Sequence, residues 1–168
     1  GDLLPDALIA DIPTRFPGFS PKNFDLTYSG GVPASRALWQ SLNIPAVKML
    51  QKYSPERFLE LLRQTGFTSF DKTADHYGLS LILGGGEATL WELTGVYASL
   101  SRVLNHDLQE KRYFSEDYHS PVLVSGNEAE EEETEDPDPP LNASSVWLTY
   151  NALLKVNRPE GEAGWQYF

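Results

Sequence analysis

Apolar residues recur at helical spacing along residues 37–50, ALWQSLNIPAVKML, and predict that this stretch buries one helical face. The pattern is interrupted by Pro45, which has no backbone N–H and disfavours the helical conformation of Ile44. We therefore expect two short helices that meet at a corner. Such a corner holds side chains in fixed places, so the polar residues Ser41 and Asn43 become candidates for a functional role.

Two further segments predict helices from their apolar period and their capping residues. Residues 54–67, SPERFLELLRQTGF, can begin at Ser54 as a cap and can end at the glycine near the end of the segment. Residues 144–156, SSVWLTYNALLKV, predict the last helix of the chain, with Asn142 or Ser144 as its cap.

The clearest helix begins after the glycine triplet 84–86, which we interpret as a structural turn. Thr89 and Glu92 are spaced as a capping box at its start. Apolar residues then recur at helical period and predict its buried face. They are Leu90, Leu93, Val96, Tyr97, Leu100 and Leu104.

The remaining segments predict loops and short strands. Residues 1–32 are rich in proline and glycine, and residues 111–125 suggest two short strands around a turn. Together the segments predict an α+β fold that is mainly helical. The length of 168 residues matches one ordinary domain.

The charge of the chain is acidic and unevenly distributed. The formal net charge of −11 would repel nucleic acid, so we expect no nucleic-acid partner. Eight of the 24 acidic residues lie within residues 128–138, and we expect 126–141 to be an acidic, disordered loop insertion. The chain has no cysteine, which excludes disulfides and thiolate chemistry.

No metal or cofactor is expected from the sequence. His76, His106 and His119 lie far apart, without a carboxylate array at the spacing of metal ligands, and we expect all three at the surface. The glycine triplet lacks the spacing of phosphate-binding loops. No apolar run is long enough for a membrane helix, so any membrane anchor is expected outside this chain.

Three segments, in order along the chain, resemble one protein family. They are DIPTRFPGFSPKNFD, SRALWQSLNIPAVKML and GLSLILGGGEATLWELTGVYASL, and the later RPEGEAGWQYF is also similar. The family is the penicillin-binding proteins, in particular the transpeptidase domain of the bifunctional class A enzymes. The resemblance covers nearly the whole chain apart from the acidic insertion, and it implies a serine β-lactamase-like fold.

The resemblance assigns roles to the two polar residues at the helix corner. The family uses the motifs S-x-x-K, S-x-N and K-T-G in this order, and Ser41-Leu42-Asn43 matches the second. By this resemblance Ser41 relays a proton, and Asn43 orients the catalytic lysine and holds the peptide backbone of the substrate. The nucleophilic serine and K-T-G are expected outside the chain. Residues 1–168 would then be a partial transpeptidase domain that is inactive alone.

One internal segment imitates the missing motifs. Ser69-Phe70-Asp71-Lys72 matches S-x-x-K, and the following residues nearly match K-T-G. Both matches share Lys72 and lie after S-x-N in one polar stretch, without an apolar helix to present a nucleophile. We interpret this segment as an ordinary loop.

The resemblance implies a parent enzyme that cross-links peptidoglycan stem peptides through a serine acyl-enzyme and binds β-lactams. Its expected location is extracytoplasmic, at the periplasmic face of the inner membrane. Two alternatives stay open: a noncatalytic protein-interaction module and a degenerate transpeptidase retained as a scaffold. Self-association of the isolated chain is also expected where apolar surface is exposed.

Overall fold

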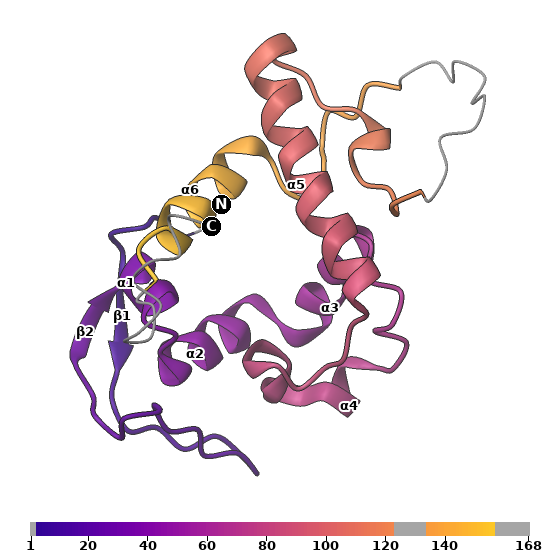
Figure 1. The fold of residues 1–168 in the computed structure, drawn as a ribbon. Helices are drawn as coiled ribbons and strands as arrows, with labels where there is room; N and C mark the ends of the chain where they lie inside the picture. The colour runs from indigo at the N-terminus through magenta and orange to yellow at the C-terminus, as the bar shows by residue number, and fades with distance from the viewer. Residues whose placement is uncertain (1–2, 123–133, 157–168) are drawn as a thin grey trace, which may run out of the picture. The chain divides into compact units, whose positions relative to one another are not determined.

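The computed structural model describes residues 3–122 and 134–156, which form helices, loops and one small sheet (Figure 1). The sheet consists of β1 (Leu8–Asp11) and β2 (Gly30–Pro33). The α-helices are α1 (Ala34–Trp39), α2 (Asn43–Tyr53), α3 (Pro55–Gln64), α4 (Ala74–Tyr77), α5 (Leu90–Glu110) and α6 (Ala143–Leu153). The 3₁₀ helices are η1 (Gly78–Leu83) and η2 (Ser115–Asp117). This mixture agrees with the expected α+β class.

The chain divides into two compact units. One comprises Gly1–Lys48 and Leu148–Phe168, and the other comprises Met49–Trp147. The length of the chain suggested one domain, and the structure divides it more finely. None of the helices within the described residues is long and apolar enough to cross a membrane.

In the first unit, the sheet leads directly into α1. β1 and β2 are antiparallel, with Ile9 opposite Val32, and Val32 is fully buried. The backbone N–H groups of Ala34 and Ser35 donate to the carbonyls of Ala7 and Pro5, at 2.9 Å each. These bonds satisfy N–H groups at the start of α1, which have no partner within the helix. The strands predicted within residues 1–32 are therefore confirmed.

The two helices expected in residues 37–50 are confirmed, but the prediction that Pro45 separates them is wrong. Pro45 lies in the first turn of α2, and the first bond of that helix runs from Ala46 N to Leu42 O at 3.2 Å. A proline is tolerated there because the N–H groups of the first turn have no intrahelical acceptor. The corner is instead made by Ser41, whose φ is +53°.

In the second unit, α3 begins and ends as the sequence predicts. The hydroxyl of Ser54 accepts from Arg57 N at 3.4 Å, and Gly66 follows the helix at a φ of +111°, which favours glycine. The buried face of α3 packs into the core of this unit. That core is made of Leu50, Leu59, Phe70, Ala74, Tyr77 and Leu81. Gly86 also has a packing role, because a Cβ there would lie 2.2 Å from Cε1 of Phe70.

The capping box of α5 is confirmed. The hydroxyl of Thr89 accepts from Glu92 N at 3.1 Å, and the carboxylate of Glu92 accepts from Thr89 N at 2.8 Å. The predicted helix at the end of the chain is also confirmed, as α6, and Asn142 is its cap. The side-chain oxygen of Asn142 accepts from Ser145 N at 2.9 Å.

The predicted buried face of α5 is partly wrong. Leu90 is 79% exposed, and Leu93 and Tyr97 are exposed as well. The helix instead buries a stripe of mostly small and polar residues, which consists of Glu92, Gly95, Ser99 and Val103. Gly95 explains this choice, because it lets a neighbouring segment approach closely. A Cβ at Gly95 would lie 2.7 Å from Cδ of Pro121.

The two strands predicted in residues 111–125 are wrong for the described part of this range. Residues 115–117 form η2, because the carboxylate of Asp117 accepts from Phe114 N at 3.0 Å and closes a tight turn. Phe114 makes only an isolated antiparallel bridge, and its partner is Glu135. Residues 123–125 lie outside the described residues.

The described end of the acidic insertion has defined backbone partners. Ser115 N donates to Thr134 O at 2.9 Å, and Asp136 N donates to Tyr113 O at 2.8 Å. The first part of the predicted loop, residues 126–133, lies outside the described residues. The expectation of a disordered loop stays a prediction for that part.

Glu92 joins the start of α5 to the preceding loop. Its carboxylate accepts from Thr68 N and Ser69 N at 2.7 Å each, and from the Ser69 hydroxyl at 2.6 Å. The Ser69 hydroxyl and the Thr89 N–H hold the pKa of Glu92 well below its ordinary value of 4.5. The carboxylate therefore binds its proton less readily in the folded chain than in the unfolded chain.

We expect Glu92→Gln to lower the free energy of unfolding by about 2 kcal/mol at pH 7, because an amide has one acceptor fewer for these donors. Since the pKa is lowered on folding, the carboxylate stabilises the fold fully above pH 4.5, and this stabilisation is lost as the pH falls towards the folded pKa. Urea unfolding at pH 7 and pH 3 measures both effects. If the free energy of unfolding differs between wild type and Glu92→Gln by the same amount at pH 7 and pH 3, the lowered pKa of Glu92 does not stabilise the fold.

Candidate functional site

Ser41 lies in the turn between α1 and α2 and is exposed to solvent. Its φ of +53° is unusual for a residue with a side chain, and such backbone costs about 1–2 kcal/mol. Its backbone N–H donates to Leu38 O at 3.0 Å, which closes the turn. Among the described residues its hydroxyl has no hydrogen-bond partner, so it is free to contact a ligand. Strained backbone of this kind is found preferentially at functional positions.

Asn43 is the first residue of α2 and is half-buried. Its Nδ2 donates to Lys22 O at 2.7 Å. Because Lys22 O can only accept, this bond fixes which end of the carboxamide faces the loop. The oxygen and the second N–H of the side chain have no other partner among the described residues. The Asn43 side chain makes no capping bond to α2 among the described residues and instead binds a distant segment.

Ser41 and Asn43 flank Leu42 at the corner. No hydrogen bond among the described residues joins their side chains. The proton-relay and orienting roles expected for them stay predictions. The geometry leaves one hydroxyl and part of one carboxamide available beside the same helix start, and these groups can donate to and accept from a bound peptide.

Two buried polar residues that no sequence pattern singled out, Asp11 and Asn23, lie next to this corner. Asp11 ends β1 and is fully buried, and Asn23 is 2% exposed. Asn23 Nδ2 donates to Asp11 Oδ1 at 2.8 Å. Both residues lie in DIPTRFPGFSPKNFD, one of the segments that carry the family resemblance, which was the available signal.

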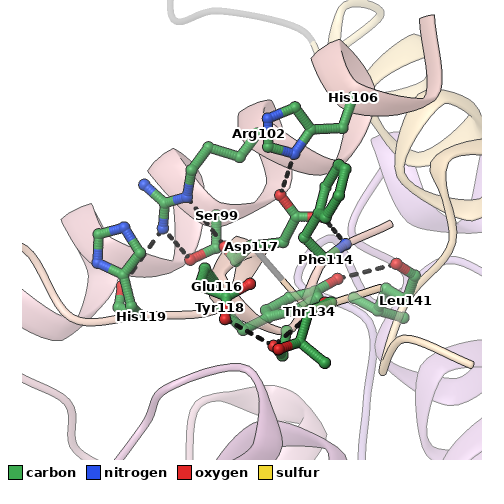
Figure 2. A network of polar contacts seen from close by, with 11 residues as sticks. Ser99, Arg102, His106, Phe114, Glu116, Asp117, Tyr118, His119, Thr134 and Leu141 are labelled. Atoms are coloured by element: carbon green, nitrogen blue, oxygen red, sulfur yellow. Dashed lines mark hydrogen bonds and ion pairs between the residues drawn. The ribbon is translucent and has the colours of Figure 1, made fainter. Parts of the chain in front are cut away.

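A second polar cluster lies in the second unit, where α5 meets the segment around η2 (Figure 2). His106 Nδ1 lies 2.7 Å from Oδ1 of Asp117, which is fully buried. The His106 ring also packs edge-on against Phe114, with the ring centroids 4.9 Å apart. The expectation that His106 lies at the surface is therefore wrong, because its ring is partly covered and paired. His76 and His119 are exposed, as predicted.

Arg102 and Tyr118 add further hydrogen bonds to this cluster. Arg102 Nε donates to Asp117 O at 3.0 Å, and Arg102 Nη2 donates to Ser99 Oγ at 2.8 Å (Figure 2). Burial raises the pKa of Tyr118 to about 12, and its hydroxyl donates to Leu141 O at 2.8 Å. Ser99 is only 1% exposed, so its hydroxyl is not accessible as a nucleophile. The Arg102–Asp117 bond fastens the segment around η2 to α5, and the Tyr118 hydroxyl ties that segment to Leu141.

The segment that imitates S-x-x-K has structural partners. Ser69 Oγ donates to Glu92 Oε2 at 2.6 Å, whereas Lys72 Nζ pairs with Asp71 at 3.1 Å. Within the described ranges, no group of three or more histidine, aspartate or glutamate side chains is suited to hold a metal.

A cavity of about 720 Å³ lies in the second unit, beside α3. Its walls carry four carboxylates, those of Glu56, Glu60, Asp136 and Asp138. Arg57 also lines it and stacks over the Tyr53 ring at 4.7 Å. Neither Ser41 nor Asn43 belongs to this cavity.

A comparison with curated proteins relates this chain to a penicillin-binding protein. That relative is penicillin-binding protein 1C of Escherichia coli (strain K12), and the two are 38% identical over 102 residues. The matched region is 61% of this chain but only 13% of the relative's length. No family model matches the chain.

We expect Asp117→Asn to lower the free energy of unfolding by about 2–3 kcal/mol, because it leaves a donor to the buried carboxylate without its partner. Asp71→Asn is the matched control, since Asp71 has an exposed pair with Lys72 and should cost less than about 1 kcal/mol. Urea unfolding at pH 7 measures both variants. Equal losses would show that the Asp117 cluster does not stabilise this unit.

Proposed function

We propose that this chain is the part of a peptidoglycan D,D-transpeptidase that carries its second catalytic motif. The observation that supports this most is the 38% identity over 102 residues with penicillin-binding protein 1C. The position of Ser41-Leu42-Asn43 at a strained helix corner, with a free hydroxyl, adds support from the geometry. The parent protein would be a bifunctional class A enzyme that acts outside the cytoplasmic membrane.

The parent reaction is acyl transfer through a serine. The serine oxygen attacks the carbonyl of the penultimate D-Ala, a serine ester forms, and the terminal D-Ala leaves as its amine. The attacking hydroxyl must lose a proton and the departing nitrogen must gain one. An amine of a neighbouring stem peptide then takes the acyl group and releases the serine.

Ser41 and Asn43 suit the proton and substrate steps of this reaction. A hydroxyl donates and accepts at once, so Ser41 can pass a proton between the catalytic lysine and the leaving nitrogen. The carboxamide of Asn43 is uncharged, so it can orient the lysine and the substrate backbone without adding a charge that would change the lysine pKa. Its bond to Lys22 O holds it in one orientation for this task.

We expect Ser41→Gly in the full-length parent to slow acylation by penicillin by about 10²-fold or more, because the relay hydroxyl is lost. Glycine adopts the φ of +53° without strain, so stability should stay within about 1 kcal/mol of wild type. Asn43→Ala should slow acylation as well. Stopped-flow acylation and thermal unfolding are the two measurements.

The control for these variants is Ser20→Ala, which removes an exposed hydroxyl of the same unit that makes no hydrogen bond to Ser41 or Asn43. It should acylate at the wild-type rate. Wild-type rates in Ser41→Gly and Asn43→Ala would remove the catalytic assignment.

We expect a fluorescent penicillin to label the full-length parent but not the isolated 168-residue chain, because S-x-x-K and K-T-G in the family's context are not in this sequence. Gel fluorescence after denaturation measures the covalent label. Stable, stoichiometric labelling of the isolated chain would contradict an outside nucleophile. An unlabelled parent would instead favour the degenerate scaffold.

A further inference from the structure

We infer that Asp11 and Asn23 are positioning residues that hold the Ser41–Asn43 corner in its working geometry. The inference rests on the proposed function, because it concerns how the same site is supported. Neither residue contacts Ser41. They act through the start of α2 and the loop that Asn43 binds.

The support begins at Asp11, whose carboxylate is fully buried and has a donor on each oxygen. Oδ1 accepts from Asn23 Nδ2 and Oδ2 accepts from Ser29 N, at 2.8 Å each. A buried carboxylate is costly unless such donors surround it. Asp11 therefore draws the 23–29 loop against the end of β1 and orients Asn23.

Asn23 connects Asp11 to the start of α2. Its Nδ2 also donates to Thr27 O at 2.9 Å, so both of its N–H groups are used. Its oxygen therefore faces the other way and accepts from Ile44 N at 3.4 Å. Ile44 N belongs to the first turn of α2, where no intrahelical acceptor exists, so Asn23 supplies the missing acceptor.

The neighbouring residues make a parallel bond, which reaches the candidate catalytic group. Lys22 O accepts from Asn43 Nδ2 at 2.7 Å, so residues 22 and 23 bind residues 43 and 44 in turn. Lys22 O is placed by the same loop that Asn23 anchors. A shift of this loop would rotate the carboxamide of Asn43, and misplacement by about 1 Å can cost roughly 10²-fold in rate.

A further contact ties the same elements together. Lys48 Nζ, one turn along α2 from Ile44, donates to Ala10 O at 3.2 Å beside Asp11. The end of β1 is thus bonded to α2 through Lys48 and through the Asp11–Asn23 pair. This arrangement supports the first turn of α2 and leaves the Ser41 hydroxyl, which no described residue binds, exposed.

The first experiment measures the geometry in the 168-residue chain by amide hydrogen exchange and ¹⁵N NMR. Asn23→Ala and Asp11→Asn should speed exchange at Ile44 N by about 10-fold relative to the amides of β1, and should shift the Asn43 side-chain signals. The control is Asp25→Asn, because Asp25 accepts from Thr27 in the same loop but makes no hydrogen bond to α2. Equal acceleration at all amides of this unit would overturn the inference, since the two residues would then only stabilise the fold.

A double variant distinguishes the positioning of the start of α2 from a general loss of stability. In Asp11→Asn/Asn23→Asp, the new amide at position 11 can donate to the new carboxylate at position 23, which can still accept from Ile44 N. Exchange at Ile44 N should return to within about threefold of wild type, although the bond to Thr27 O is lost. No recovery in the double variant would overturn the inferred chain of contacts.

The second experiment tests function in the full-length parent. Asn23→Ala should lower the first-order acylation constant for penicillin by about 10-fold or more, with the double variant recovering part of it and Asp25→Asn unchanged. If Ser41→Gly is slow but Asn23→Ala is not, the inference fails while the proposed function stands. If Ser41→Gly acylates at the wild-type rate, the proposed function fails, and the positioning role fails with it.

Discussion

The structure depends on one constraint, which is that a carboxylate removed from water needs hydrogen-bond donors around it. Asp11 meets this need with Asn23 and Ser29, and Glu92 meets it with the loop at residues 68–69. Asp117 meets it with Phe114 N and His106. In each case at least one donor comes from another segment, so each carboxylate connects separate parts of the chain.

These carboxylates also explain why the packing departs from a simple apolar face. α5 turns its small and polar stripe inward because Glu92 must reach its donors and Gly95 must admit Pro121. Some of its leucines are left exposed as a result. A helix that obeyed apolar periodicity alone would bury those leucines and leave Glu92 in water. The hydrogen bonds of Glu92 and the close packing at Gly95 therefore offset the apolar area that these leucines leave exposed.

The corner at Ser41 combines local strain with support from a distance. Its left-handed backbone is unfavourable for serine, yet it lets α2 begin where Asn23 can accept from Ile44 N. The same corner leaves the Ser41 hydroxyl in solvent and turns part of the Asn43 carboxamide to the loop at Lys22. Strain, support and free polar groups at one place are typical of functional sites. The similarity to penicillin-binding protein 1C supports the catalytic roles that we propose for these groups.

The sequence by itself determined the features that depend on hydrogen bonds between residues within one turn of each other. The capping box at Thr89 and Glu92, the cap at Ser54 and the glycine after α3 all act within one turn of backbone, so sequence spacing predicted them. The Ser41-Leu42-Asn43 motif was also visible as a pattern. Tertiary structure alone decided that the corner lies at Ser41, that α5 buries Glu92, and that Asn23 joins Asp11 to the start of α2. Those features depend on donors and acceptors brought together from residues 12 or more positions apart, and no local period records such pairings.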